Sequence, residues 1–196
     1  MKKQTNNSLR TIIAITLLSM LSIMASCQQR KEPNRNATAS QTKEKPPKID
    51  IHTAVMTDNI EAVRQHIAAG TNLNEKDPFG GSSPLINASL FGKTVMAKML
   101  IEARADLNFR NNDGSTALHT ASFFCRPEIV KMLLNKGADK TIKNKYGSTA
   151  YESVAGPFAA VKSSYDLLGK MLEPMGLKLD YTYLEKTRPE VAAMLK

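Results

Sequence analysis

The chain repeats itself with a period of 33 or 34 residues through its middle part. Positions 52, 86, 119 and 152 are equivalent in this repeat and lie 34, 33 and 33 residues apart. A second marker recurs at Gly70, Arg104 and Gly137, again 34 and 33 residues apart. Such a period is typical of proteins built from stacked units, where each unit covers the apolar face of its neighbour and three or more units are needed for stability.

Each unit has two short stretches with apolar residues at helical spacing, joined by polar turns. In the third unit, Thr116 is placed to cap the first helix, and Pro127 lies in the first turn of the second, where its missing N–H does no harm. The second helix then carries an apolar stripe made of Ile129, Val130, Leu133 and Leu134. A single helix pair cannot bury such a stripe, so neighbouring pairs must stack.

These units resemble the ankyrin repeat, whose signature is G-x-T-P-L-H-x-A followed by a second helix and G-A-D-x-N. Residues 114–139 match it best, with Thr116-Ala117-Leu118-His119 and Gly137-Ala138-Asp139. The resemblance implies an all-α ankyrin-repeat solenoid over residues 49–157, built from helix-turn-helix repeats with short hairpin loops. The repeats are expected at about 50–76, 77–110, 111–143 and, incompletely, 144–157.

Two departures from the signature carry structural expectations. Arg104 stands where the family has the glycine that turns out of the second helix, so a positive φ is expected there at the cost of some strain. Gly156-Pro157 is expected to cut the first helix of the fourth repeat short.

Residues 158–196 leave the repeat pattern. One apolar face at helical spacing predicts a helix from about 158 to 173; it is formed by Phe158, Val161, Tyr165, Leu168 and Leu172. Pro174 and Gly176 are expected to end this helix, and Pro189 to start a last turn or two of helix. We interpret the segment as a helical C-terminal cap that closes the open end of the array. A partner-binding tail is the alternative.

The N-terminus has the pattern of an export signal. Lys2, Lys3 and Arg10 precede an uncharged apolar run over residues 12–25, which is too short to span a bilayer as a helix. Met24-Ala25-Ser26-Cys27 resembles the lipobox of bacterial lipoproteins, which implies a signal peptide over 1–26 and acylation of the Cys27 thiol. Ordinary cleavage that leaves Cys27 as a free thiol is the alternative. Gln28, in place of Asp, favours the outer membrane by resemblance to Gram-negative sorting rules.

The net charge of +9 is concentrated outside the repeats. Residues 28–48 are polar and contain three prolines, so with Cys27 they are expected to form a basic, disordered tether over 27–48. Three positive charges lie in the signal and a net four in the tether, which leaves +2 on residues 49–196. This distribution, together with export, argues against nucleic-acid binding.

No catalytic motif of the common kinds occurs: the chain has no G-x-S-x-G, H-E-x-x-H, P-loop or C-x-x-C. His52 and His119 occupy the histidine position of the ankyrin signature, where the resemblance implies that the ring bonds turn backbone. Their expected separation of roughly 20 Å is too large for one metal. His66 and Cys125 are expected to be structural. We therefore expect no enzymatic activity, no cofactor, no metal and no small-molecule substrate.

The resemblance also implies where a partner protein would bind. Ankyrin partners usually contact the hairpin tips and the exposed positions of the first helices, which line a concave groove. The corresponding helix positions are Met56, Thr57, Leu90, Phe91, Phe123 and Phe124. The corresponding tip positions are Phe79, Arg110, Asn112 and Tyr146. The helix positions are mostly apolar, which predicts an exposed strip for an interaction; packing of some of these rings against a neighbouring repeat is the alternative.

The sequence therefore favours a non-catalytic interaction module, tethered by lipid to the bacterial envelope and facing the periplasm or the cell surface, that binds an envelope protein. A narrower version is an immunity or protective partner that masks an exported toxin or enzyme. Two further alternatives are an enzyme whose site is assembled in an oligomer and a tether to the cell wall.

Overall fold

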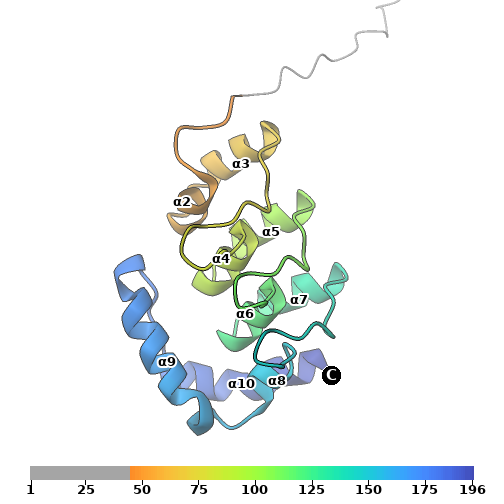
Figure 1. Cartoon of the computed structure of the whole chain (residues 1–196), viewed down its shortest axis with the longest axis vertical. Coiled ribbons are helices and arrows are strands. Elements are labelled where there is room, and N and C mark those ends of the chain that lie inside the picture. Colours follow the sequence, from red (N-terminus) through yellow and green to blue (C-terminus); the bar gives the residue numbers. More distant parts are fainter. Residues whose placement is uncertain (1–44) are drawn as a thin grey trace, which may run out of the picture. The chain divides into compact units, whose positions relative to one another are not determined.

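The computed structural model describes residues 45–196, and the regular elements in this part of the chain are helices (Figure 1). The signal peptide, Cys27 and most of the tether lie outside the described residues. The helices are α2 (Ile51–Met56), α3 (Ile60–Ala68), α4 (Pro84–Phe91), α5 (Thr94–Glu102), α6 (Ala117–Phe123), α7 (Pro127–Asn135), α8 (Glu152–Ala155), α9 (Phe158–Leu172), the 3-10 turn η1 (Glu173–Met175) and α10 (Tyr181–Leu195).

The helices form two columns (Figure 1). The first helices of the repeats, α2, α4, α6 and α8, pack on one another in succession, and the second helices, α3, α5 and α7, do the same. Each first helix of the three complete repeats also packs on its own second helix. The expected all-α solenoid of helix-turn-helix repeats is confirmed.

Each complete repeat starts its first helix with a capping side chain. Asp50 accepts a hydrogen bond from the Thr53 amide at 2.9 Å, and Ser83 accepts one from Ile86 at 3.3 Å. Thr116 and His119 form a reciprocal capping box at the start of α6. These bonds satisfy amides that a helix N-terminus leaves free, so the local sequence fixes where each repeat begins.

The turn between the two helices of each repeat contains one residue in the left-handed conformation. Gly92 has φ of 67°, and the equivalent residues Asp58 and Cys125 have φ of 55° and 51°. The turn that leaves the second helix has the same requirement, and Arg104 adopts φ of 64° where the other repeats have glycine. The strained conformation expected for Arg104 is confirmed.

The core lies between the two columns and runs through the repeats without interruption. Its largest fully buried aliphatic side chains include Leu85, Met96, Leu100, Leu118, Ile129 and Leu133. Leu134, expected in the apolar stripe of α7, is only partly buried. Because each repeat supplies one wall of its neighbour's core, the helix ends that carry the candidate binding residues are held in a fixed register.

The fourth repeat is completed in an unexpected way. Its first helix α8 is four residues long, as Gly156-Pro157 predicts, and α9 covers the expected 158–173 range to within a residue. The second-helix position is taken by α10, which packs on α7 and α8. Residues 158–180 are thus an excursion between the two helices of one repeat (Figure 1).

The expectation for Pro189 was wrong, because α10 begins eight residues earlier and contains this proline. Asp180 starts the helix by accepting a hydrogen bond from the Tyr183 amide at 3.0 Å. Pro189 and Glu185, whose carbonyl loses its usual i+4 donor, are both exposed, so water can bond that carbonyl. Within residues 45–196, no helix is long and apolar enough to cross a bilayer.

Candidate protein-binding surface

The predicted binding residues fall into two groups. We call Met56, Thr57, Leu90, Phe91, Phe123 and Phe124 the helix-end strip, because they lie at the C-terminal ends of α2, α4 and α6. We call Phe79, Arg110, Asn112 and Tyr146 the hairpin tips, because they lie in the loops that connect successive repeats.

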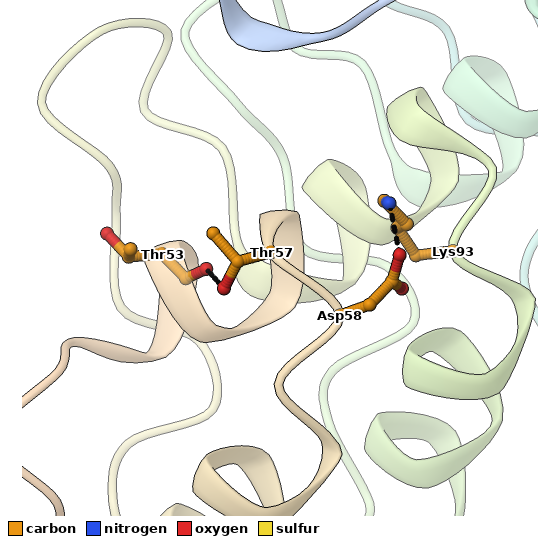
Figure 2. Close-up of polar contacts among 4 residues, drawn as sticks. All are labelled: Thr53, Thr57, Asp58 and Lys93. Carbon is orange, nitrogen blue, oxygen red and sulfur yellow. Dashed lines mark hydrogen bonds and ion pairs between the residues drawn. The ribbon is translucent and has the colours of Figure 1, made fainter.

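The first two repeats leave their part of the helix-end strip partly open. Met56, Leu90 and Phe91 are partly buried and Thr57 is exposed. The Thr57 hydroxyl donates to the Thr53 carbonyl at 2.7 Å, and the following residue, Asp58, forms an ion pair with Lys93 of the second repeat (Figure 2). This pair ties the two repeats together behind the strip.

The third repeat does not present the expected exposed rings. Phe124 is only 5% exposed, and Phe123 is partly buried under Tyr165 of α9, with ring centroids 4.5 Å apart. The expectation that these two rings extend an open apolar strip was wrong. The physical reason is that Tyr165 of α9 packs against both rings. Helix α9 lies along the first-helix column, on the side away from α5 and α7 (Figure 1).

The hairpin tips carry the most exposed aromatic rings of the described residues. Phe79 is 82% exposed and Tyr146 is 75% exposed. Arg110 and Asn112 lie between them in the repeat order and are also exposed. Two exposed rings on the first and third of these three loops are a potential pair of anchors for a partner, because aromatic side chains contribute strongly to binding when they are covered.

Hydrogen bonds between side chains and backbone groups hold the tips in place. Asp77 accepts from the amides of Phe79 and Gly80 at 2.9 and 2.8 Å. Burial raises the pKa of Asp77, but these bonds and one from Asn87 outweigh it, so the pKa lies below its ordinary value. Arg110 donates to the Gly114 carbonyl of its own loop and, at 2.7 Å, to the Lys143 carbonyl of the next loop. Its guanidinium therefore joins loops, which leaves it less free for a partner.

The histidines serve the fold. His119 bonds the Ser148 carbonyl at 3.0 Å, as expected, whereas His52 accepts from the Asn87 side-chain amide at 3.1 Å. His66 bridges Thr71 and the carbonyl of Ile49. Within residues 45–196, no three His, Cys, Asp or Glu side chains come together as metal ligands.

Cys125 is fully buried, and burial raises the pKa of its thiol to about 11. The thiol is therefore protonated at neutral pH, and it donates weakly to the Leu184 carbonyl. The residue fills the small position predicted for it in the turn between α6 and α7, where the second repeat has Gly92. A protonated, buried thiol is a poor nucleophile.

Two residues beyond the first three repeats shape this surface, and no local sequence pattern indicates their role. Tyr165 is fully buried, and its hydroxyl donates to the Phe123 carbonyl. Arg188 of α10, 3% exposed, donates to the Tyr165 hydroxyl at 3.0 Å and to the Gly156 carbonyl at 3.1 Å. Burial raises the pKa of Tyr165 to about 12, so the phenol stays protonated. These bonds fix α9 against the end of α6.

Comparison with known proteins agrees with this geometry. Residues 51–144, just under half of the chain, match the family model described as ankyrin repeats (3 copies). A crystal structure titled as the ankyrin repeat domain of Bcl-3, a unique member of the IkappaB protein family, is similar with a TM-score of 0.51 and 32% sequence identity. The match covers 53% of this chain and 45% of that chain, so less than half of that structure is represented. No curated protein matches the chain.

Proposed function

Because residues 51–144 are an array of ankyrin repeats, a type of domain that generally mediates protein–protein interactions, we propose that this protein is a non-catalytic binding module of the bacterial envelope. It binds a partner protein through its hairpin tips and the open part of the helix-end strip. The residues assigned to this contact are Phe79, Arg110, Asn112, Tyr146, Met56, Thr57, Leu90 and Phe91.

The observation that carries this proposal is the exposure of Phe79 and Tyr146 on loops whose backbones are fixed by hydrogen bonds. A rigid loop loses little conformational entropy when its aromatic ring is covered, so more of the contact energy remains for binding. The near-neutral charge of residues 49–196 favours a partner recognised by apolar contact over one recognised by charge. Phe123 and Phe124 are left out because α9 covers them.

The envelope location rests on the sequence alone. The basic start, the short apolar run and the lipobox-like residues before Cys27 support acylation of this cysteine, and Gln28 supports the outer membrane, with the repeats in the periplasm or at the cell surface. On this proposal the tether limits how far the repeats reach from the membrane, at most about 70–75 Å if it is fully extended.

Photo-crosslinking from single positions tests the binding proposal. A photoreactive side chain replaces Phe79 or Tyr146 in the full-length protein, expressed in its native envelope, and Val95 serves as the matched control. Val95 is an apolar residue 54% exposed on α5, in the second-helix column. We expect one crosslinked partner from both tips and none from position 95. Equal or absent crosslinking from the three positions contradicts the proposed surface.

The anchor has a separate test. Cys27→Ala should abolish labelling by an acyl-chain precursor and release the protein from the membrane fraction, or leave it unprocessed. The chain contains two cysteines, so Cys125→Ala is the matched control and should keep the label. Acyl labelling that persists in the Cys27→Ala protein excludes a lipid anchor at this residue.

A further inference from the structure

The excursion formed by α9, η1 and the following loop lies outside the two stacked columns of the repeats. The second-helix column continues from α7 to α10, and the first-helix column ends at α8. Helix α9 belongs to neither column and lies beside the first-helix column (Figure 1). Its role therefore has to be sought in the surface that it covers.

That surface is the third-repeat part of the helix-end strip. Tyr165 stacks on Phe123 with an interplanar angle of 28° and meets the edge of Phe124 at 6.3 Å between centroids. The equivalent residues of the first two repeats have no such aromatic cover and stay partly open or exposed. A helix of this chain thus occupies the end of the strip that adjoins the open part, which the proposed function assigns to a partner.

Helix α9 is attached by one fully buried side chain and by four partly buried apolar ones, Phe158, Val161, Leu168 and Leu172. Tyr165 is the one side chain among its fifteen residues that is fully buried. Leu167 and Met171 are apolar yet 67% and 59% exposed. A helix with one fully buried side chain is expected to open more readily than α4 and α6, which bury six and five side chains.

We propose that α9 occupies the site on this protein at which a helix of the partner binds. The helix-end strip accepts an amphipathic helix that inserts an aromatic ring beside Phe123, and a partner helix of this kind displaces α9. The proposal rests on the proposed function, because it specifies the partner's contact as helical. The hydrogen bond chain from Arg188 through Tyr165 to Phe123 sets how readily α9 leaves.

A synthetic peptide of residues 157–176, labelled with fluorescein, is the probe, and its binding to the full-length protein is measured by fluorescence anisotropy. Tyr165→Phe in the protein keeps the ring stack and removes the hydroxyl, which weakens α9 in cis. The peptide carries the hydroxyl and restores both hydrogen bonds in trans. We expect about tenfold tighter binding to this variant than to the unchanged protein, since the population of the open state limits apparent affinity.

Tyr183→Phe is the matched control in the protein. Tyr183 lies on α10, and its hydroxyl also donates to a carbonyl, that of Cys125 at 3.3 Å, but it does not hold α9. This variant should bind the peptide as the unchanged protein does. A peptide that has Phe in place of Tyr165 should lose the gain. Circular dichroism melting verifies that all proteins are folded.

Each outcome decides the proposal. A gain specific to Tyr165→Phe and to the tyrosine-containing peptide supports a displaceable helix. No binding to any folded variant, or equal binding to all three proteins, overturns it. Crosslinks from the hairpin tips without peptide displacement would leave the proposed function standing and remove this inference. Displacement of α9 by the peptide without any crosslink from the hairpin tips would support the displaceable helix and remove the proposed binding surface.

Discussion

The guanidinium of Arg188 donates a hydrogen bond to the hydroxyl of Tyr165 at 3.0 Å, although Arg188 is 3% exposed and forms no salt bridge within residues 45–196. A buried arginine without a carboxylate partner is uncommon, because removing its charge from water is costly. This buried charge lies where α9, α10 and the end of α6 meet.

Replacing Arg188 by Met should change the free energy of unfolding by less than about 1 kcal/mol, because the cost of the unpaired charge disappears together with its two hydrogen bonds. Arg188→Ala should cost about 2–4 kcal/mol, because it also leaves a cavity. Urea unfolding followed by circular dichroism compares the two. A loss for Met as large as that for Ala would show that the charge and its hydrogen bonds, and not the packed volume, stabilise the fold.

A negative charge at Phe123 should destabilise the protein strongly, whereas the same change at Phe79 should not. Phe123→Asp places a carboxylate against Tyr165, so we expect a loss of about 3 kcal/mol or more. Phe79 is 82% exposed, and Phe79→Asp should lower stability by less than about 0.5 kcal/mol. Thermal melts separate the two cases, and equal melting temperatures would contradict the observed packing of α9.

Arg104→Gly should stabilise the protein by about 0.5–1 kcal/mol. Arg104 is exposed and holds φ of 64°, a conformation that is strained for a residue with a Cβ atom. Arg104→Ala, the control, removes the same side chain but keeps the strain, so it should give no gain. A stabilisation shared by both variants would assign the effect to the charge of Arg104.

The stability of the protein should fall as the pH drops below about 6.5, in part because of His119. Burial lowers the pKa of this histidine below its ordinary value of 6.5. Between 6.5 and the lower folded pKa, the unfolded chain binds a proton that the folded chain does not, so stability decreases as pH falls. Urea midpoints from about pH 7 to 5 should show a flatter profile for His119→Gln; an unchanged slope would exclude this contribution.

The repeat period was sufficient to predict the helices of the first three repeats, because caps such as Thr116 and turn residues such as Arg104 act locally. The cover over Phe124 could not be predicted in the same way. A helix that folds back onto an earlier repeat leaves no periodic signal in either segment. The position of Pro189 inside α10 was not predictable for a related reason. The proline is tolerated because the Glu185 carbonyl, which loses its donor, is exposed to water, and this exposure is visible only in the folded structure.

The insertion of α9 between the two helices of the fourth repeat also sets an order for folding. The first three repeats are built from neighbouring segments of chain, so they can form early and propagate from one another. The fourth repeat needs residues up to Leu195, which is buried only when α10 docks on α7. The array therefore closes only when α10 docks, and removing Leu195 with the rest of the last turn of α10 would weaken this closure.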